Sequence, residues 1–356
     1  MNTLAVIIGV GARTSVGLTA RHTAFLLRAG SVGFHASPLL DLNDEYVTIG
    51  SVPTLDPMLV GAERVQALAA AAADEALEAV TDVAGVAAGL RLKLVVGLGE
   101  RLARHEPGQP SPAEMIGQAL RNRVVKRFAT ANVETFPRGE AAAPLQLEAA
   151  CAELTSGRTD LVLLGGAHSD YDPVVVRGLS QQNRLFGAGQ VNGVMPGEAA
   201  GFLLLAGAQF ANRHGRPVRA RLHAIGKGFE KARPDNDESA FEALGLTVAV
   251  HAAAAPLAAD NLRAGWALTD MTPEAHRVNE WQAMFVRTQR YWCDPQWIDA
   301  HAHKLGRLGA AAMPVQLAIA ATAWRHGFAP HGVALSMVGS DSGERATTLW
   351  SAPARA

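Results

Sequence analysis

The sequence predicts an α/β fold built from two related halves. Short apolar runs of strand length alternate with alanine-rich helical stretches along the chain, a pattern typical of helices packed on a sheet. Each half also contains one helix too apolar to have a solvent-exposed face, at Ala141 to Ser156 and at Gly306 to Trp324. The repeated order strand, helix, strand, helix therefore suggests an internal duplication of an α/β unit.

The first half is organised around Thr135 to Gly166, where the pattern predicts a tight turn, a buried helix and a buried strand. Gly157 is suited to end the helix, and Asp160 to Gly166 is a short apolar run with paired glycines, typical of a strand covered on both faces. The turn carries Glu140. Free N–H groups at a helix start favour an anion, so this turn is the first candidate site.

The remaining elements follow from the same patterns. Before the central stretch we expect strands at Ala5 to Gly11 and Lys93 to Gly99, helices from Thr14 to Ala29 and from Glu63 to Val80, and a loop from Asp41 to Pro57. A further helix is expected to begin with the capping box Ser111 and Glu114 and to run to about Phe128. After it we expect a helix from Asp172 to Gln182, a glycine loop and a buried strand beyond Pro196.

A polar, breaker-rich segment at Asn212 to Pro217 predicts the boundary between the halves, which gives units of 1–211 and 212–356. The second unit is expected to contain strands at Val218 to Gly226, Gly265 to Asp270, Val333 to Met337 and Thr347 to Ser351, and helices at Asp237 to Ala259, Arg277 to Arg290 and the buried stretch, with Pro314 as a possible kink.

Composition excludes several classes of function. A net charge of −1 with 18% charged residues gives no basic field for nucleic acid. Two cysteines, without CxxC spacing, predict neither disulfides nor a metal site, and Gly9, Gly11 and Gly17 do not form a dinucleotide loop, so no cofactor is expected. The apolar start is too short for a membrane span and has no preceding basic residue, so a cytoplasmic protein is expected.

Six segments resemble the β-ketoacyl synthase branch of the thiolase superfamily: IIGVGARTSVGLT, SGRTDLVLLGGAHS, NGVMPGEAAGFLLLA, FANRHGRPVRARLHAIGKG, KLGRLGAAAMPVQLAIAATAWRHG and ALSMVGSDSGERATTLW. They occur in the order of that family and span nearly the whole chain. The resemblance implies a thiolase-like five-layer αβαβα fold with two related halves, and a two-fold dimer.

The resemblance also implies a Cys-His-His site, which this chain does not retain. The family's nucleophilic Cys lies about 25 residues before the paired glycines, where this chain has Glu140 (165 − 140 = 25). The first family His falls at Asp270, with His276 slightly later, and the second falls on Gly306 or Arg307. Cys151, about 16 Å further along the helix, is interpreted as a buried small hydrophobe.

Other polar residues receive weaker interpretations. The closing glycine loop of the family implies that Gly339, Ser340, Ser342 and Gly343 bind substrate. Glu198 is interpreted as a structural hydrogen-bonding acid. His301, His303 and Lys304 could crowd a cleft, but a solvated loop is the simpler interpretation.

Three hypotheses follow for the function. The leading one is a non-condensing relative that binds an acyl-carrier protein or acyl-CoA thioester and acts, as a homodimer or with an active ketosynthase, as a partner or chain-length-type subunit in fatty-acid or polyketide-type assembly. The second makes Glu140 a base or nucleophile in acyl transfer, thioester hydrolysis or decarboxylation, although a helix N-terminus and Arg307 would lower its pKa. The third is an inert Glu140–Arg307 ion pair that fills the former pocket.

Overall fold

The computed structural model describes residues 1–81, 89–125, 127–187, 189–234 and 241–353. Ten strands form one continuous sheet in the order β10-β9-β11-β12-β8-β1-β7-β6-β4-β5. Their bounds are β1 Ala5–Thr14, β4 Arg91–Leu98, β5 Thr130–Pro137, β6 Leu161–Ser169, β7 Glu198–Ala206, β8 Ala220–Phe229, β9 Ala264–Thr269, β10 Trp292–Ala300, β11 Val333–Gly339 and β12 Glu344–Ser351. A separate hairpin pairs β2 (His35–Leu40) with β3 (Tyr46–Ile49).

The two halves of this sheet have the same topology. Counted from its own first strand, each half runs third, second, fourth, fifth, first: β5-β4-β6-β7-β1 on one side and β10-β9-β11-β12-β8 on the other. Only three residue pairs join β1 to β8, at Ala5 to Ile7, so the halves meet along a short seam. The predicted two related halves are confirmed, while the division at residue 211 stays a prediction.

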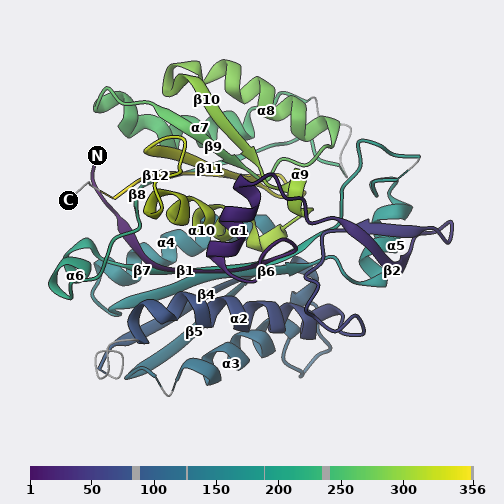
Figure 1. Cartoon of the computed structure of the whole chain (residues 1–356), viewed down its shortest axis with the longest axis horizontal. Helices are drawn as coiled ribbons and strands as arrows, with labels where there is room; N and C mark the ends of the chain where they lie inside the picture. Colours follow the sequence, from purple (N-terminus) through teal and green to yellow (C-terminus); the bar gives the residue numbers. More distant parts are fainter. Residues whose placement is uncertain (82–88, 126, 188, 235–240, 354–356) are drawn as a thin grey trace.

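Helices complete five layers (Figure 1). The outer layer on the first half is α2 (Gly61–Thr81) and α3 (Pro112–Val124), and on the second half α7 (Gly245–Ala259) and α8 (Ala275–Arg287). Between the sheet halves lie α1 (Ala20–Arg28), α4 (Ala142–Thr155) and α10 (Ala312–Arg325). Shorter helices are α5 (Pro173–Gln181), α6 (Ala208–Arg213), α9 (Ala302–Leu305) and the 3₁₀ turns η1 (Glu100–Ala103), η2 (Gly139–Ala141), η3 (Gln289–Tyr291) and η4 (Gly309–Ala311). The predicted five-layer fold is thus confirmed.

The two central helices differ from their predictions in detail. Helix α10 is buried from Ala312 through Ala323, as expected, but it begins after Gly306, and Pro314 lies in its first turn, where its missing N–H is not needed. The predicted kink is therefore wrong. Helix α4 is buried mainly over its first half, and Ala152 and Thr155 near its end are exposed.

The sequence-based assignment missed both edge strands of the large sheet, β5 and β10. Each mixes polar and apolar residues without a continuous apolar run, and each contains a proline, Pro137 and Pro295. Proline and polar residues are tolerated at sheet edges because one side of the strand has no ladder to form.

Among the described residues, no helix has both the length and the apolar character needed to span a membrane.

Candidate active site

The Glu140 side chain lies at the turn that leads into α4. Gly139, with φ +55°, begins this turn, a conformation that glycine adopts without strain. The residue is half-buried, and its carboxylate makes no hydrogen bond or ion pair with any residue that the structure describes. This free carboxylate distinguishes Glu140 from the acids around it.

The charged residues that shift the pKa of Glu140 come from four separate segments of the chain. Burial raises the pKa of Glu140, the carboxylates of Asp341 and Asp270 add to the rise, and Arg307 and His168 oppose it. The sequence argument that the helix start and Arg307 would lower this pKa is therefore wrong, because desolvation and two neighbouring acids outweigh them.

Arg307 pairs with Asp170 rather than with Glu140. Its Nε and Nη2 donate to the two carboxylate oxygens of Asp170 at 3.0 and 2.7 Å. The Nε2 of His168 lies 3.0 Å from Asp170 Oδ1. Burial alone would raise the pKa of Asp170, but Arg307 and His168 hold it well below its usual range. The hypothesis of a Glu140–Arg307 ion pair is contradicted, since the guanidinium is already occupied by a better buried acid.

Asp270 follows the end of β9 and holds the glycine loop in place. Its Oδ1 accepts from Arg277 Nη2 at 2.6 Å, and its Oδ2 accepts from the Gly339 N–H at 2.9 Å. Burial raises the pKa of Asp270, while Arg277 and the Gly339 N–H oppose the rise. With both oxygens engaged, Asp270 is placed to position the loop, and a catalytic role for it stays a prediction.

His276 lies on α8, half-buried, with no hydrogen bond to a described residue. Burial lowers its pKa, Glu274 opposes this, and Arg277 and Arg184 reinforce it. Arg184 ties Glu274 to Asp341, with its Nε 2.8 Å from Glu274 Oε1 and its Nη1 2.8 Å from Asp341 Oδ2. His276 is thus at the margin of the charged cluster that surrounds Glu140.

The predicted substrate loop is held by its own side chains. The hydroxyls of Ser340 and Ser342 are 2.6 Å apart, and both donate to the Glu344 carboxylate. Gly343 adopts φ +101°, which explains a glycine at that turn. Substrate binding by Gly339, Ser340, Ser342 and Gly343 stays a prediction, and the two hydroxyls would have to leave Glu344 to contribute.

Sequence reasoning missed His168, Asp170 and Asp341. His168 and Asp170 come directly after the paired glycines of β6, in the motif GGAHSD, so polar residues at the end of a buried strand were the available signal. Gly309 packs so closely on His168 that an added Cβ would lie 2.2 Å from the ring. The turn that begins α10, at Gly309–Ala311, therefore fixes the position of this histidine.

Two interpretations from the sequence agree with the structure. Glu198 is fully buried, and its oxygens accept from Arg64 at 2.7 and 2.8 Å, from Ser169 at 2.6 Å and from the Val52 N–H at 2.6 Å. Cys151 packs against the core, and burial raises the pKa of its thiol to about 11. Glu198 is a structural acid, and Cys151 is poorly suited to act as a nucleophile.

Chemically, the cluster offers one unpaired carboxylate of raised pKa beside a histidine and an arginine. Such a group can accept or donate a proton, whereas it cannot form the stable thioester that a thiolate forms. No group of His, Cys, Asp or Glu in the described part of the chain is arranged to hold a metal ion.

The fold is that of a thiolase-like ketosynthase. A search of protein-family models finds no match, and a search of curated proteins finds none either.

Three solved structures illustrate the likeness. The ishigamide ketosynthase/chain length factor superposes with a TM-score of 0.78 at 18% identity, covering 98% of this chain and 99% of that one. The ketosynthase from module 6 of the Bacillus subtilis bacillaene synthase gives 0.79 at 13% identity, covering 99% and 72%. A type II polyketide synthase acyl-carrier protein in complex with its ketosynthase, bound to the hexaketide, gives 0.74 at 15% identity, covering 99% and 100%.

Proposed function

We propose that this protein is a non-condensing ketosynthase-like subunit that binds an acyl-carrier protein or an acyl thioester in fatty-acid or polyketide-type assembly. The single observation that supports the proposal is the turn before α4, which presents the Glu140 carboxylate. We infer from the spacing of the resembled family that a condensing enzyme has its thiolate at this position. The two cysteines of the chain offer no substitute for that thiolate. Cys151 has a raised pKa, and Cys293 lies on the edge strand β10.

The neighbours support the type of partner. One similar structure is named as a ketosynthase/chain length factor, and another contains an acyl-carrier protein with its ketosynthase. By analogy we infer that this chain works as a dimer, with itself or with an active ketosynthase, in the cytoplasm. The free edge of β5, directly before the Glu140 turn, leaves that side of the sheet open to a partner.

Binding to the partner tests the proposal directly. Native mass spectrometry of the full chain with a malonyl-loaded and an acyl-loaded carrier protein, and separately with an active type II ketosynthase, should yield a complex with at least one of them. The absence of any complex, together with no binding of acyl-CoA by calorimetry, would remove the basis for the subunit hypothesis.

A second candidate function, acyl-thioester hydrolysis or decarboxylation by Glu140, is favoured by the raised pKa and the unpaired state of that carboxylate. Here Glu140 would act as a general base, with Arg307 and His168 beside the reacting group. A base works best when its pKa lies near the working pH, and burial raises the pKa of Glu140 in that direction.

Intact-protein mass spectrometry with malonyl and acyl thioesters separates the two candidates. Release of free thiol or carbon dioxide that is lost in Glu140→Gln but kept in Glu148→Gln would establish the enzyme. Glu148 is an exposed glutamate of α4 that pairs with Lys227. Equal background release by all three proteins would leave only the binding subunit.

A further inference from the structure

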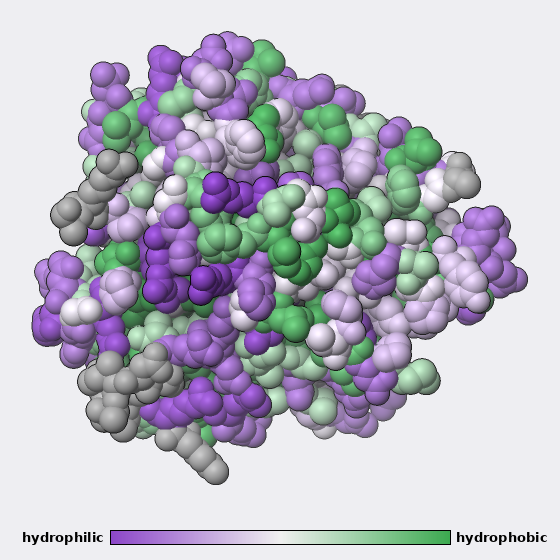
Figure 2. Space-filling view, in the orientation of Figure 1, coloured by the Kyte–Doolittle hydropathy of each residue, from purple (hydrophilic) through white to green (hydrophobic). Residues whose placement is uncertain are grey.

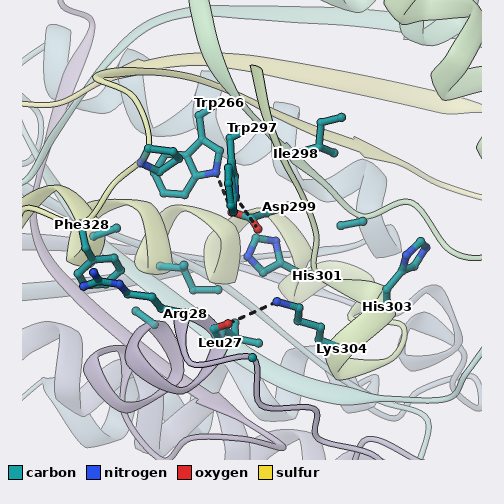
Figure 3. A pocket seen from close by; sticks show the side chains of 16 residues that line it. Leu27, Arg28, Trp266, Trp297, Ile298, Asp299, His301, His303, Lys304 and Phe328 are labelled. Atoms are coloured by element: carbon teal, nitrogen blue, oxygen red, sulfur yellow. Dashed lines mark hydrogen bonds between the residues drawn. The ribbon is translucent and has the colours of Figure 1, made fainter. Parts of the chain in front are cut away.

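A cavity lies away from the Glu140 turn, between α1, the end of β10, α9 and α10. Its volume is about 610 Å³, within the range of roughly 300–1,000 Å³ that small-molecule sites occupy. Aromatic side chains form much of its wall: Trp266 from β9, Trp297 from β10 and Phe328 beyond α10 (Figure 3). Hydrophobic side chains also gather near the centre of the face seen in Figure 2, over α1, where Phe25 and Leu26 are exposed.

The one acid among the lining residues is already occupied. The Nε1 of Trp266 donates to Asp299 Oδ2 at 2.8 Å, and the Nε1 of Trp297 donates to Oδ1 at 3.3 Å. Asp299 therefore positions the two indoles, and their flat faces are left as the apolar surface of the cavity (Figure 3).

The two cations of the lining have no acid partner. Lys304 makes one long hydrogen bond, 3.4 Å to the Leu27 carbonyl, and Arg28 lies 4.8 Å over the ring of Phe328. Neither is in an ion pair within the described residues. An ammonium at the rim of an aromatic cavity with two unused donors favours an anionic group on whatever enters.

His301 lies between these features. The sequence suggested a solvated loop, but the residue is only 4% exposed, and its Nδ1 is buried with no hydrogen-bond partner. Figure 3 shows the ring between the Asp299 carboxylate and the Lys304 ammonium. Burial lowers the pKa of His301, so the ring is neutral at pH 7 and offers one donor and one acceptor. A buried polar atom without a partner is uncommon and indicates that a ligand atom or a water completes it.

We propose that this cavity binds a hydrophobic monocarboxylate, with the carboxylate at Lys304 and His301 and the apolar body between Trp266, Trp297 and Phe328. A neutral ligand would leave the Lys304 ammonium unmatched. A phosphorylated ligand is disfavoured because a doubly charged group would meet a mostly apolar wall and a single ammonium, that of Lys304. The site is independent of the Glu140 cluster and of the function proposed for it.

Calorimetry on the full chain tests the site with two carboxylates of different shape. These are 2-naphthylacetate, an aromatic acid, and decanoate, a fatty acid. At least one should bind, and the uncharged analogue, 2-naphthylethanol or decanol, should bind at least tenfold more weakly. Lys304→Met, which keeps the length of the side chain and removes its charge, should weaken the acid at least tenfold. Trp297→Ala should also weaken it, and its half-exposed indole makes this variant safe for folding.

Matched controls keep the test specific. Lys227→Met removes an exposed lysine that pairs with Glu148, and Glu140→Gln alters the other site, so neither should change the affinity. No binding of either acid at millimolar concentration, equal binding of acid and alcohol, or full affinity in Lys304→Met would each overturn the proposal.

Discussion

The turns that begin α4 and α10 are equivalent parts of the two halves, and they differ mainly in one side chain. Residues 139–147 and 309–317 share Gly, Ala, Ala, Pro, Gln and Leu at matching positions. Both turns begin with a glycine of positive φ, +55° at Gly139 and +49° at Gly309, and both pass through a 3₁₀ turn into a helix. Glu140 in the first turn corresponds to Ala310 in the second.

The surroundings of the two turns explain this difference. Gly309 and Ala310 are packed against His168 and Gly166, so the second turn has no room for a longer side chain. Beside Gly139 there is no atom within 4 Å of the position of an added Cβ. The same backbone therefore serves as a packing element in one half and presents a free carboxylate in the other.

The largest expected effect comes from the ion pair beside the second turn. Arg307→Met leaves Asp170, which is 1% exposed, without its arginine partner and with His168 as the remaining side chain bonded to it, and should lower the free energy of unfolding by roughly 3–5 kcal/mol. Urea denaturation measures this. Glu140→Gln, beside the first turn, should change stability far less, and equal losses in the two variants would contradict the pairing seen here.

The two glycines offer the most direct comparison of the turns. Gly139→Ala adds only the strain of a left-handed residue, about 1–2 kcal/mol. Gly309→Ala adds the same strain and forces the new Cβ into the His168 ring, which should cost a further ~1–3 kcal/mol. Thermal unfolding of both variants should show the larger loss of stability in Gly309→Ala. Equal losses, or a larger loss in Gly139→Ala, would mean that the turn before α10 relaxes around the new Cβ.

The pH dependence of stability isolates Glu140 itself. Because its folded pKa lies above its unfolded value, ionisation costs stability as pH rises through the folded pKa, and nothing is lost below the unfolded pKa. Glu140→Gln should therefore be more stable than the native chain at pH 8, with the difference vanishing by about pH 4. Chemical denaturation at several pH values measures the difference, and a constant gap would show that the side chain acts through packing alone.

The smallest effect is expected at Cys151. With a pKa of about 11, only about one thiol in a thousand is ionised at pH 8, so iodoacetamide should label it slowly in the folded protein and rapidly in urea. Cys151→Ser should leave thioester binding unchanged. Fast labelling of Cys151 in the folded chain would reopen it as a nucleophile.

The interior of the fold was predictable from the sequence, and its edges were not. Strands β4, β6 and β7 each contain a continuous apolar run, at 94–98, 161–167 and 199–206, because both faces are covered there. Strands β5 and β10 pair on one side only, so polar residues and proline are permitted and the pattern resembles a loop.

The site was predictable only in part. A turn before an apolar helix and the acid at its centre are local features, and they identified Glu140. The partner of Arg307 depends on how β6 and the loop before α10 approach each other, and no spacing along the chain encodes that Asp170 meets Arg307 across 137 residues. Likewise, His301 is only 4% exposed and shares its cavity with Leu27 and Trp266, which are distant from it in the sequence.

The interleaving of the central helices bears on whether the chain could be divided. Helix α10 of the second half contacts β1, β6 and β7 of the first, and α4 of the first contacts β8 and β12 of the second. A chain cut between α6 and β8 would give two fragments, each with an apolar helix that loses part of the sheet covering it. Such fragments should aggregate when expressed singly and reassemble when expressed together. The two halves, although similar in topology, would then fold as one cooperative unit.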